Sequence, residues 1–95
     1  MKGMVTIMTV TFYGKVVEYT NGDSTFAPDP GVCLTLRSLI DFLGICYGED
    51  FKLFLLGKDT CIFLINSSGI MLTGGLDSPV NIGDKIEILP FVDAG

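Results

Sequence analysis

The sequence contains no histidine and no tryptophan, and only six of its 95 residues are lysine or arginine. Without histidine, the Ser-His and Cys-His pairs that activate a nucleophile cannot form. The basic residues are scattered singly among eleven acidic ones, and the formal net charge is −5. No basic stripe can neutralise phosphates, so we expect no nucleic-acid partner. An acidic chain of this size is better suited to docking on basic protein surfaces.

Long apolar runs are also missing. No stretch approaches the ~20 residues that a membrane helix needs. The first ten residues, MKGMVTIMTV, place threonines between apolar residues and do not resemble a signal peptide. With a hydrophobic fraction of 48%, the chain has ample material for the core of one domain. We therefore expect a single cytoplasmic domain with no membrane partner.

Cysteine is scarce, and its spacing is wide. Cys33, Cys46 and Cys61 are odd in number and flanked by apolar residues. This pattern fits neither a disulfide framework nor a zinc site. We expect the three side chains to be buried small hydrophobes in a reducing compartment, and no metal site.

The remaining polar motifs carry no recognisable chemistry. The Thr-Gly-Gly segment at 73–75 lacks the lysine of a phosphate-cradling loop. Asp77 and Asp84 sit at turn positions, where each can cap its own turn, and neither has a second carboxylate at a fixed spacing. The sequence thus predicts a protein without an active site of its own, and not an enzyme.

The first half predicts two strands and a helix. Residues 5–13 alternate apolar residues with threonine, as a half-buried strand does, and residues 15–19 are a candidate second strand. A turn-rich loop fills 20–31, and 32–35 is a candidate short strand. The helix starts at the N-cap Thr35 and ends near Gly44, a candidate left-handed C-cap. Its apolar stripe has i, i+3, i+4, i+7 spacing: Leu36, Leu39, Ile40 and Leu43.

The second half predicts a short helix within 48–59, although a strand is an alternative there. A continuous apolar run at 60–66 indicates a buried strand, and Asn66 opens an Asn-Ser-Ser-Gly turn. A short strand and glycine-rich loop are expected over 70–79, and a final strand over 85–91. The first and last strands are the most regular, so we expect them to pair at the sheet centre. The predicted fold is an α+β roll of the ubiquitin-like β-grasp kind, with a mixed sheet and one main helix packed across it.

Pro90 divides the chain into a domain at 1–90 and an extended tail at 91–95, because proline removes a ladder donor and ends the strand. A glycine end offers an unhindered α-carboxylate on an arm narrow enough to enter another protein's catalytic pocket. A frayed end that happens to be glycine is the alternative. The predicted site residues are Pro90, Phe91, Val92, Asp93, Ala94 and Gly95. Phe91 and Val92 either complete a core strand or anchor a partner.

The segment 63–95 resembles the C-terminal half of the molybdopterin synthase small subunit and of the related thiamin sulfur carriers. The shared features are an asparagine turn at Asn66, the Leu-Asp-Ser-Pro segment at 76–79, a Gly-Asp turn at 83–84, and a last strand that runs through Pro90 to a glycine end. The helix that begins at Thr35 is similar to the family's first helix.

This resemblance implies a β-grasp sulfur carrier. A ubiquitin-activating-type enzyme would adenylate Gly95 with ATP, and a sulfur donor would convert the acyl-adenylate to a thiocarboxylate. No bound cofactor is implied. In the molybdopterin case the carrier inserts its tail into the large synthase subunit and delivers sulfur to the pterin precursor.

Two residues depart from the family pattern. Ala94 stands where the family has a penultimate glycine, and Phe91 where it usually has a proline. Alanine adopts extended backbone freely, but it could also mark a relative that kept the fold and lost the chemistry. Two alternatives therefore remain open. One is a ubiquitin-like modifier that joins Gly95 to a target lysine, and the other is a binding module that transfers nothing.

Overall fold

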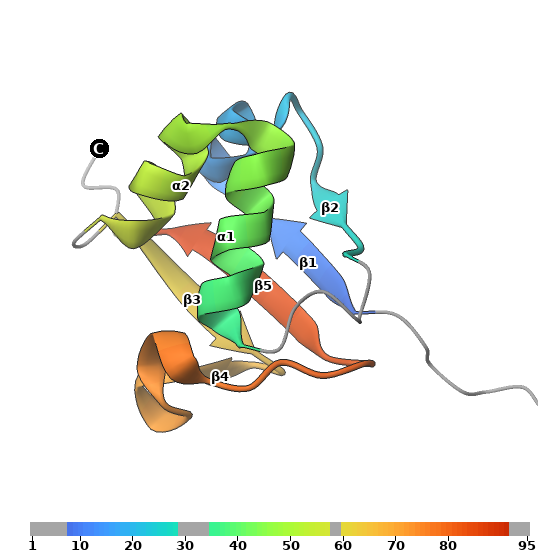
Figure 1. Ribbon diagram of the computed structural model, residues 1–95, viewed down its shortest axis with the longest axis vertical. Helices are drawn as coiled ribbons and strands as arrows, with labels where there is room; N and C mark the ends of the chain where they lie inside the picture. The colour runs from blue at the N-terminus through green and yellow to red at the C-terminus, as the bar shows by residue number, and fades with distance from the viewer. Residues whose placement is uncertain (1–7, 29–34, 58–59, 92–95) are drawn as a thin grey trace, which may run out of the picture.

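The computed structural model describes residues 8–28, 35–57 and 60–91, and Figure 1 shows the arrangement of their elements. A five-stranded sheet carries two α-helices and three short 3-10 helices. In chain order the elements are β1 (Thr9–Phe12), η1 (Gly14–Thr20), β2 (Thr25–Phe26), α1 (Leu36–Tyr47), α2 (Glu49–Leu56), β3 (Cys61–Ile65), β4 (Ser68–Gly69), η2 (Ile70–Leu72), η3 (Gly75–Asp77) and β5 (Lys85–Pro90).

The sheet has the strand order β2-β1-β5-β3-β4, so the last strand of the chain lies at its centre. β5 runs parallel to β1, with Val10 opposite Ile86 and Phe12 opposite Ile88, and antiparallel to β3. The predicted pairing of the first and last strands is confirmed. The mixed sheet with helices packed across it is the predicted α+β β-grasp fold.

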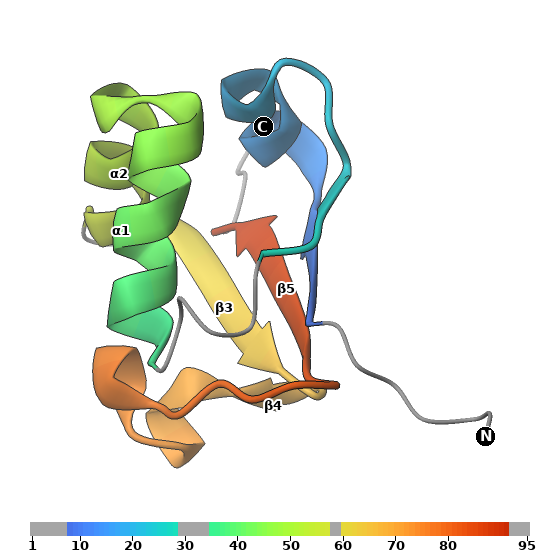
Figure 2. The same cartoon turned by 45° about the vertical axis from the view of Figure 1, so that its right-hand side comes forward.

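The core lies between one face of the sheet and the helices, which Figure 2 shows together on that face. Strand alternation sends Val10 and Phe12 inward, and these residues meet Ile86 and Ile88 of β5. The predicted helical stripe faces them and is fully buried: Leu36, Leu39, Ile40 and Leu43. Each such side chain contributes about 1.5–3 kcal/mol of hydrophobic free energy when it leaves water.

α1 begins as predicted but ends later. Thr35 accepts a hydrogen bond from the Ser38 backbone N–H (3.2 Å), and the Ser38 hydroxyl accepts one from the Thr35 N–H (2.9 Å). The predicted C-cap at Gly44 is wrong, because the helix continues to Tyr47 and ends at Gly48. Gly44 serves packing instead, since a Cβ there would lie only 2.9 Å from the Lys52 Cβ of α2.

Two predicted strands are wrong. Residues 15–19 form η1, because Gly14, at φ +58°, turns the chain out of β1, and Val16 and Thr20 become the buried side of a helical turn. Over 70–79 the chain forms the 3-10 turns η2 and η3 instead of a strand, and Met71 and Leu72 of η2 are almost fully exposed.

Other expectations are met in part. The short helix over 48–59 is confirmed as α2, and the turn at Asn66 is confirmed by its positive φ of 51°. β3 forms as predicted, but only Phe63 and Ile65 are buried, since the other face of this sheet is open. The turn-rich loop over 20–31 contains the short strand β2. Positions 5–7 and 32–34 of the predicted strands lie outside the described residues.

The cysteine prediction is wrong at one position. Cys46 is exposed in the last turn of α1, where the ring of Tyr47 takes the inward place. Cys61 is half-buried, and Cys33 lies outside the described residues. Within the described ranges no group of three or more histidine, cysteine, aspartate or glutamate side chains is arranged to hold a metal ion. None of the described helices is long and apolar enough to cross a membrane.

Aromatic rings join α1 and α2 to β1. Tyr47 makes edge contacts with Phe12 (6.0 Å between ring centroids) and Phe51 (5.8 Å). Its hydroxyl reaches back to the loop before β2 and donates a hydrogen bond to Asp23 Oδ2 at 3.0 Å. Burial first, and then this hydrogen bond, raise the pKa of Tyr47 to about 12.

The capping box at Thr35 should be worth about 1 kcal/mol, the usual value of a side-chain N-cap. Thr35→Ala removes the acceptor and should lower the free energy of unfolding by that amount. Thr35→Ser keeps the hydroxyl and is the matched control. Urea unfolding measures both, and equal stability of the two variants would contradict the role of the cap.

Tyr47 should make the fold sensitive to alkaline pH. Because its folded pKa of about 12 lies above the ordinary 10.0, its stabilisation is complete below pH 10 and is lost as pH rises toward 12. Tyr47→Phe should flatten this decline in urea midpoints measured across that window. A decline as steep as in the parent would assign the effect to other groups.

Candidate functional site

The site is the root of the C-terminal tail, where β5 leaves the sheet. Of the six predicted site residues, the structure describes Pro90 and Phe91. Pro90 is the last residue of β5 and pairs with Cys61 of β3, which confirms that the strand ends at the proline. Phe91 follows it and is 40% exposed. Positions 92–95 lie outside the described residues, so the roles of Val92, Asp93, Ala94 and Gly95, and the division at 90, stay predictions.

Both neighbours of β5 hold its last residues, β1 as far as Ile88 and β3 as far as Phe91. On the β1 side, the Tyr13 N–H donates to the Ile88 carbonyl at 3.0 Å. On the β3 side, the Phe91 N–H donates to the Thr60 carbonyl, also at 3.0 Å. Pro90 has no N–H to donate, so Phe91 supplies the next available donor. The tail therefore starts from a fixed position, one residue beyond the strand.

Gly14 packs directly against the proline. An ideal Cβ at this position would lie 3.0 Å from Pro90 Cγ, and the backbone φ of +58° also favours glycine. Gly14 lies between the two strands predicted over 5–13 and 15–19, and its contact with Pro90 was not predicted. The position of this glycine, directly after the first strand, could have predicted the contact. If the first strand pairs in parallel with the last one, the ends of the two strands lie side by side.

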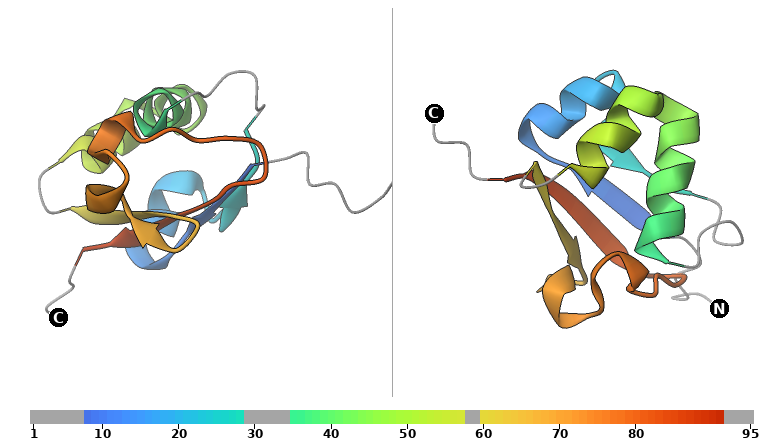
Figure 3. Two further views of the ribbon diagram at one scale, coloured as in Figure 1. Left: turned by 90° about the horizontal axis from the view of Figure 1, so that it is seen from below. Right: turned by 60° about the vertical axis from the view of Figure 1, so that its left-hand side comes forward.

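Thr60 connects the tail root to α2. Its hydroxyl lies within hydrogen-bond distance of the carbonyls of Phe54 and Gly57, at the end of that helix. Its own carbonyl accepts the Phe91 N–H. Figure 3 shows the end of β5 beside the start of β3 and close to the end of α2. The sequence offered no signal for this residue, since a threonine before a strand is ordinary.

The outer face of the sheet carries a polar contact near the same end. The Tyr13 hydroxyl donates to Glu87 Oε2 at 2.7 Å, and this hydrogen bond is the main reason that the pKa of Tyr13 is raised. Lys85 Nζ lies 3.8 Å from the same carboxylate oxygen. These contacts join Tyr13, the residue after β1, to Glu87 and Lys85 on the outer face of β5.

Cys61 lies beside Pro90 but is unsuited to act as a nucleophile. Burial raises the pKa of its thiol, which lowers the population of the reactive thiolate. Its sulfur lies 3.8 Å from the Leu55 carbonyl, at the end of α2. Within the described residues, the site therefore positions the root of the tail and offers no activated thiol at Cys61.

The polar segment at 76–84 lies at the other end of β5 and serves the fold. Asp77 was predicted to cap its own turn, but its carboxylate pairs with Arg37 of α1 at 3.2 Å. The Ser78 carbonyl accepts the Leu36 N–H at 2.9 Å. Asp84 does cap its turn, since it accepts the Asn81 N–H at 2.8 Å. These contacts fix the start of α1 and of β5, not a reacting group.

Gly14→Ala should lower the free energy of unfolding by about 1–2 kcal/mol for the left-handed backbone, and by a further amount for the crowding against Pro90. Gly75→Ala is the matched control, because Gly75 has a similar φ of +66° and an added Cβ there meets nothing within 4 Å. Chemical unfolding measures both. If the two variants lose the same stability, the contact with Pro90 carries no weight.

Several solved structures share this architecture at low sequence identity. CysO from Mycobacterium tuberculosis, described as an antigen, superposes with a TM-score of 0.78 at 22% identity, over 90% of this chain and 99% of that one. Small archaeal modifier protein 1 of Haloferax volcanii gives 0.69 at 19%, over 92% and 99%. A protein of Pyrococcus furiosus, named only as a candidate molybdopterin converting factor subunit 1, gives 0.72 at 15%, over 92% and 99%. These similarities establish the β-grasp fold.

The sequence itself matches one family model, described as the ThiS family, over residues 10–95. No curated protein matches the chain. The family consists of sulfur carriers that an adenylating partner modifies at the C-terminus and that have no catalytic activity of their own. This confirms the resemblance seen in the sequence and the prediction that the chain is not an enzyme. The chain therefore belongs to the ThiS family of ubiquitin-like sulfur carriers.

Proposed function

We propose that Gly95 is the group that carries sulfur in this protein, and that the chain acts as the small subunit of molybdopterin synthase. The observation that carries the proposal is the fixed root of the tail: β1 holds β5 as far as Ile88, and β3 holds it through Pro90 to Phe91. A rigid base with a short arm beyond it suits a carboxylate that must enter another protein's active site.

The chemistry would proceed in two steps on the partner enzyme. A Gly95 carboxylate oxygen attacks the α-phosphorus of ATP, and pyrophosphate leaves, which gives an acyl-adenylate. A sulfur donor at the oxidation level of hydrosulfide then attacks the carbonyl carbon, and AMP leaves with the former carboxylate oxygen. The product is a thiocarboxylate at Gly95. The carrier supplies the carboxylate and its placement, and the partner supplies the catalytic groups.

Ala94 is compatible with this route if the tail is bound in extended conformation, because alanine adopts that conformation without strain. Phe91 in place of a proline keeps a backbone N–H, and this N–H forms the hydrogen bond to Thr60. Phe91 therefore adds a backbone hydrogen bond at the root of the tail that a proline, which has no N–H, could not form.

The assignment to molybdopterin synthase is supported by the sequence segment 63–95, which resembles the small subunit of that enzyme. The acceptor would then be the large synthase subunit, which takes the tail into its own active site. A ubiquitin-like modifier is the second candidate, favoured by the similarity in fold to small archaeal modifier protein 1. Both candidates need the same activation at Gly95.

Activation can be tested by intact mass after incubation of the chain with ATP, an adenylating enzyme that acts on ThiS-family carriers, and a sulfur donor. We expect a mass gain equal to the exchange of one oxygen for sulfur. Deletion of Gly95, or extension beyond it, should abolish the gain. Ala94→Gly is the matched variant, and its rate should lie within about threefold of the parent's, a difference below 1 kcal/mol.

A chain that gains no mass with several adenylating enzymes would contradict the proposal. The acceptor is tested separately, by adding the thiocarboxylated chain to a molybdopterin synthase large subunit and its pterin precursor. Sulfur transfer to the pterin supports the small-subunit role. Isopeptide-linked adducts on cellular proteins, without such transfer, would favour the modifier instead.

A further inference from the structure

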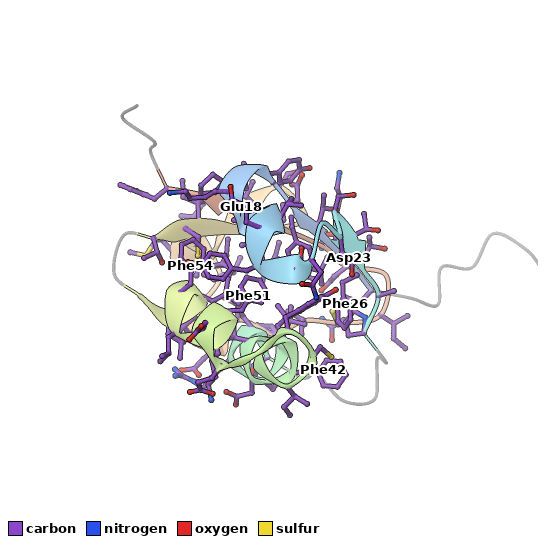
Figure 4. All side chains as sticks on the ribbon, turned by 90° about the horizontal axis from the view of Figure 1, so that it is seen from above. Glu18, Asp23, Phe26, Phe42, Phe51 and Phe54 are labelled. Carbon is purple, nitrogen blue, oxygen red and sulfur yellow. The ribbon has the colours of Figure 1, made fainter. Side chains whose placement is uncertain are left out.

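A hollow lies between η1 and α2, beside the root of the tail. It has a volume of about 290 Å³ and is lined by Lys15, Glu18, Tyr19 and Phe54. Figure 4 shows Glu18 on η1 and Phe54 on α2, on the same side of the molecule. Neither the fold nor the tail chemistry described above accounts for this hollow.

Its floor is aromatic and rigid. The ring of Tyr19 stacks on Phe54 at 4.6 Å between centroids and on Phe51 at 5.7 Å. Phe51 is 1% exposed and packs against Phe12 in the core, so this stack is anchored in the interior. Tyr19 itself is 36% exposed, which leaves apolar ring surface accessible at the floor of the hollow.

Its rim is charged and unpaired. Lys15 and Glu18 are exposed, and within the part of the chain that the structure describes neither side chain forms a hydrogen bond or an ion pair. An apolar floor inside a polar rim is the usual arrangement of a pocket that receives one anchoring side chain of a protein partner. The volume is sufficient for one large apolar side chain.

Both walls of the hollow are attached to the tail root. η1 begins at Gly14, which packs against Pro90. At the end of α2, the carbonyls of Phe54 and Gly57 lie within hydrogen-bond distance of the Thr60 hydroxyl. The Thr60 carbonyl in turn accepts a hydrogen bond from the Phe91 N–H. Four residues beyond Phe91 reach at most about 14 Å when fully extended. An enzyme that reacts with Gly95 must therefore come within that distance of Phe91, next to the hollow.

We propose that this hollow is a docking site for the adenylating enzyme that activates the tail. The enzyme inserts one apolar side chain against Tyr19 and Phe54, and places an acidic group opposite Lys15 and a basic group opposite Glu18. This inference rests on the proposed function, because it assigns the hollow to the partner that modifies Gly95. It adds a recognition surface that lies outside the tail.

The test is the steady-state rate of carrier-dependent ATP–pyrophosphate exchange, measured with the full chain. Lys15→Glu, Glu18→Lys and Tyr19→Ala should each raise the KM for the carrier by about 5- to 20-fold, and leave kcat within about twofold, because docking weakens while the reacting tail is unchanged. Tyr19→Phe keeps the ring stack and should behave like the parent.

Arg37→Glu is the charge control for Lys15→Glu, although it also breaks the ion pair with Asp77, which is exposed and contributes little to stability. It makes the same change of charge at the start of α1, at the end of the fold away from the tail root, and it should leave KM unchanged. Thermal unfolding tells whether Tyr19→Ala has lost its fold. The two rim variants change exposed side chains, so they test the inference even if Tyr19→Ala unfolds.

The outcomes separate the two proposals. If the parent chain is adenylated and both rim variants keep its KM, the hollow is not the docking site and the role of Gly95 stands. If the parent is not adenylated, the proposed function fails and the docking inference falls with it. If the rim variants weaken binding only to the large synthase subunit, the assignment to the adenylating enzyme is wrong.

Discussion

The parallel pairing of β1 with β5 is the contact on which the rest of the structure depends. It brings residues 9–12 against residues 85–88 and buries Val10, Phe12, Ile86 and Ile88 under the helices. Because strands in parallel pairs end on the same side, the end of β1 and the end of β5 lie together. Gly14 therefore meets Pro90, and the tail leaves the sheet beside η1.

The same pairing explains why this fold suits a carrier. A terminal strand at the edge of a sheet is held from one side only and frays easily. Here the terminal strand is central, with β1 and β3 on its two sides, and the hydrogen bond from the Phe91 N–H to Thr60 extends this support past the proline. The root of the arm that we propose to be reactive thus belongs to one of the most firmly held strands of the molecule. The catalytic groups can then belong wholly to the partner.

Much of this fold was predictable from local patterns. The alternation in β1 and β5, the apolar stripe of α1 and the cap at Thr35 each depend on neighbours in the sequence, so they could be predicted correctly. The predictions were wrong where contacts with residues distant in the sequence determine the local structure. Gly44 has the residue type of a helix end, but α2 packs Lys52 against it and the helix continues. Residues 15–19 have the composition of a strand, but the turn at Gly14 removes them from the sheet.

The sequence by itself determined which catalytic chemistry is absent and where the last strand ends. The lack of histidine excludes the common nucleophile pairs, and Pro90 ends β5 because it has no N–H to donate. Only the tertiary structure decided how the root of the tail, at Pro90 and Phe91, is held and what surrounds it. Gly14, Thr60 and the hollow at Tyr19 come from separate parts of the chain, and local periodicity carries no information about contacts between such parts. Their meeting at one end of β5 follows from strand order, which packing of the whole core selects.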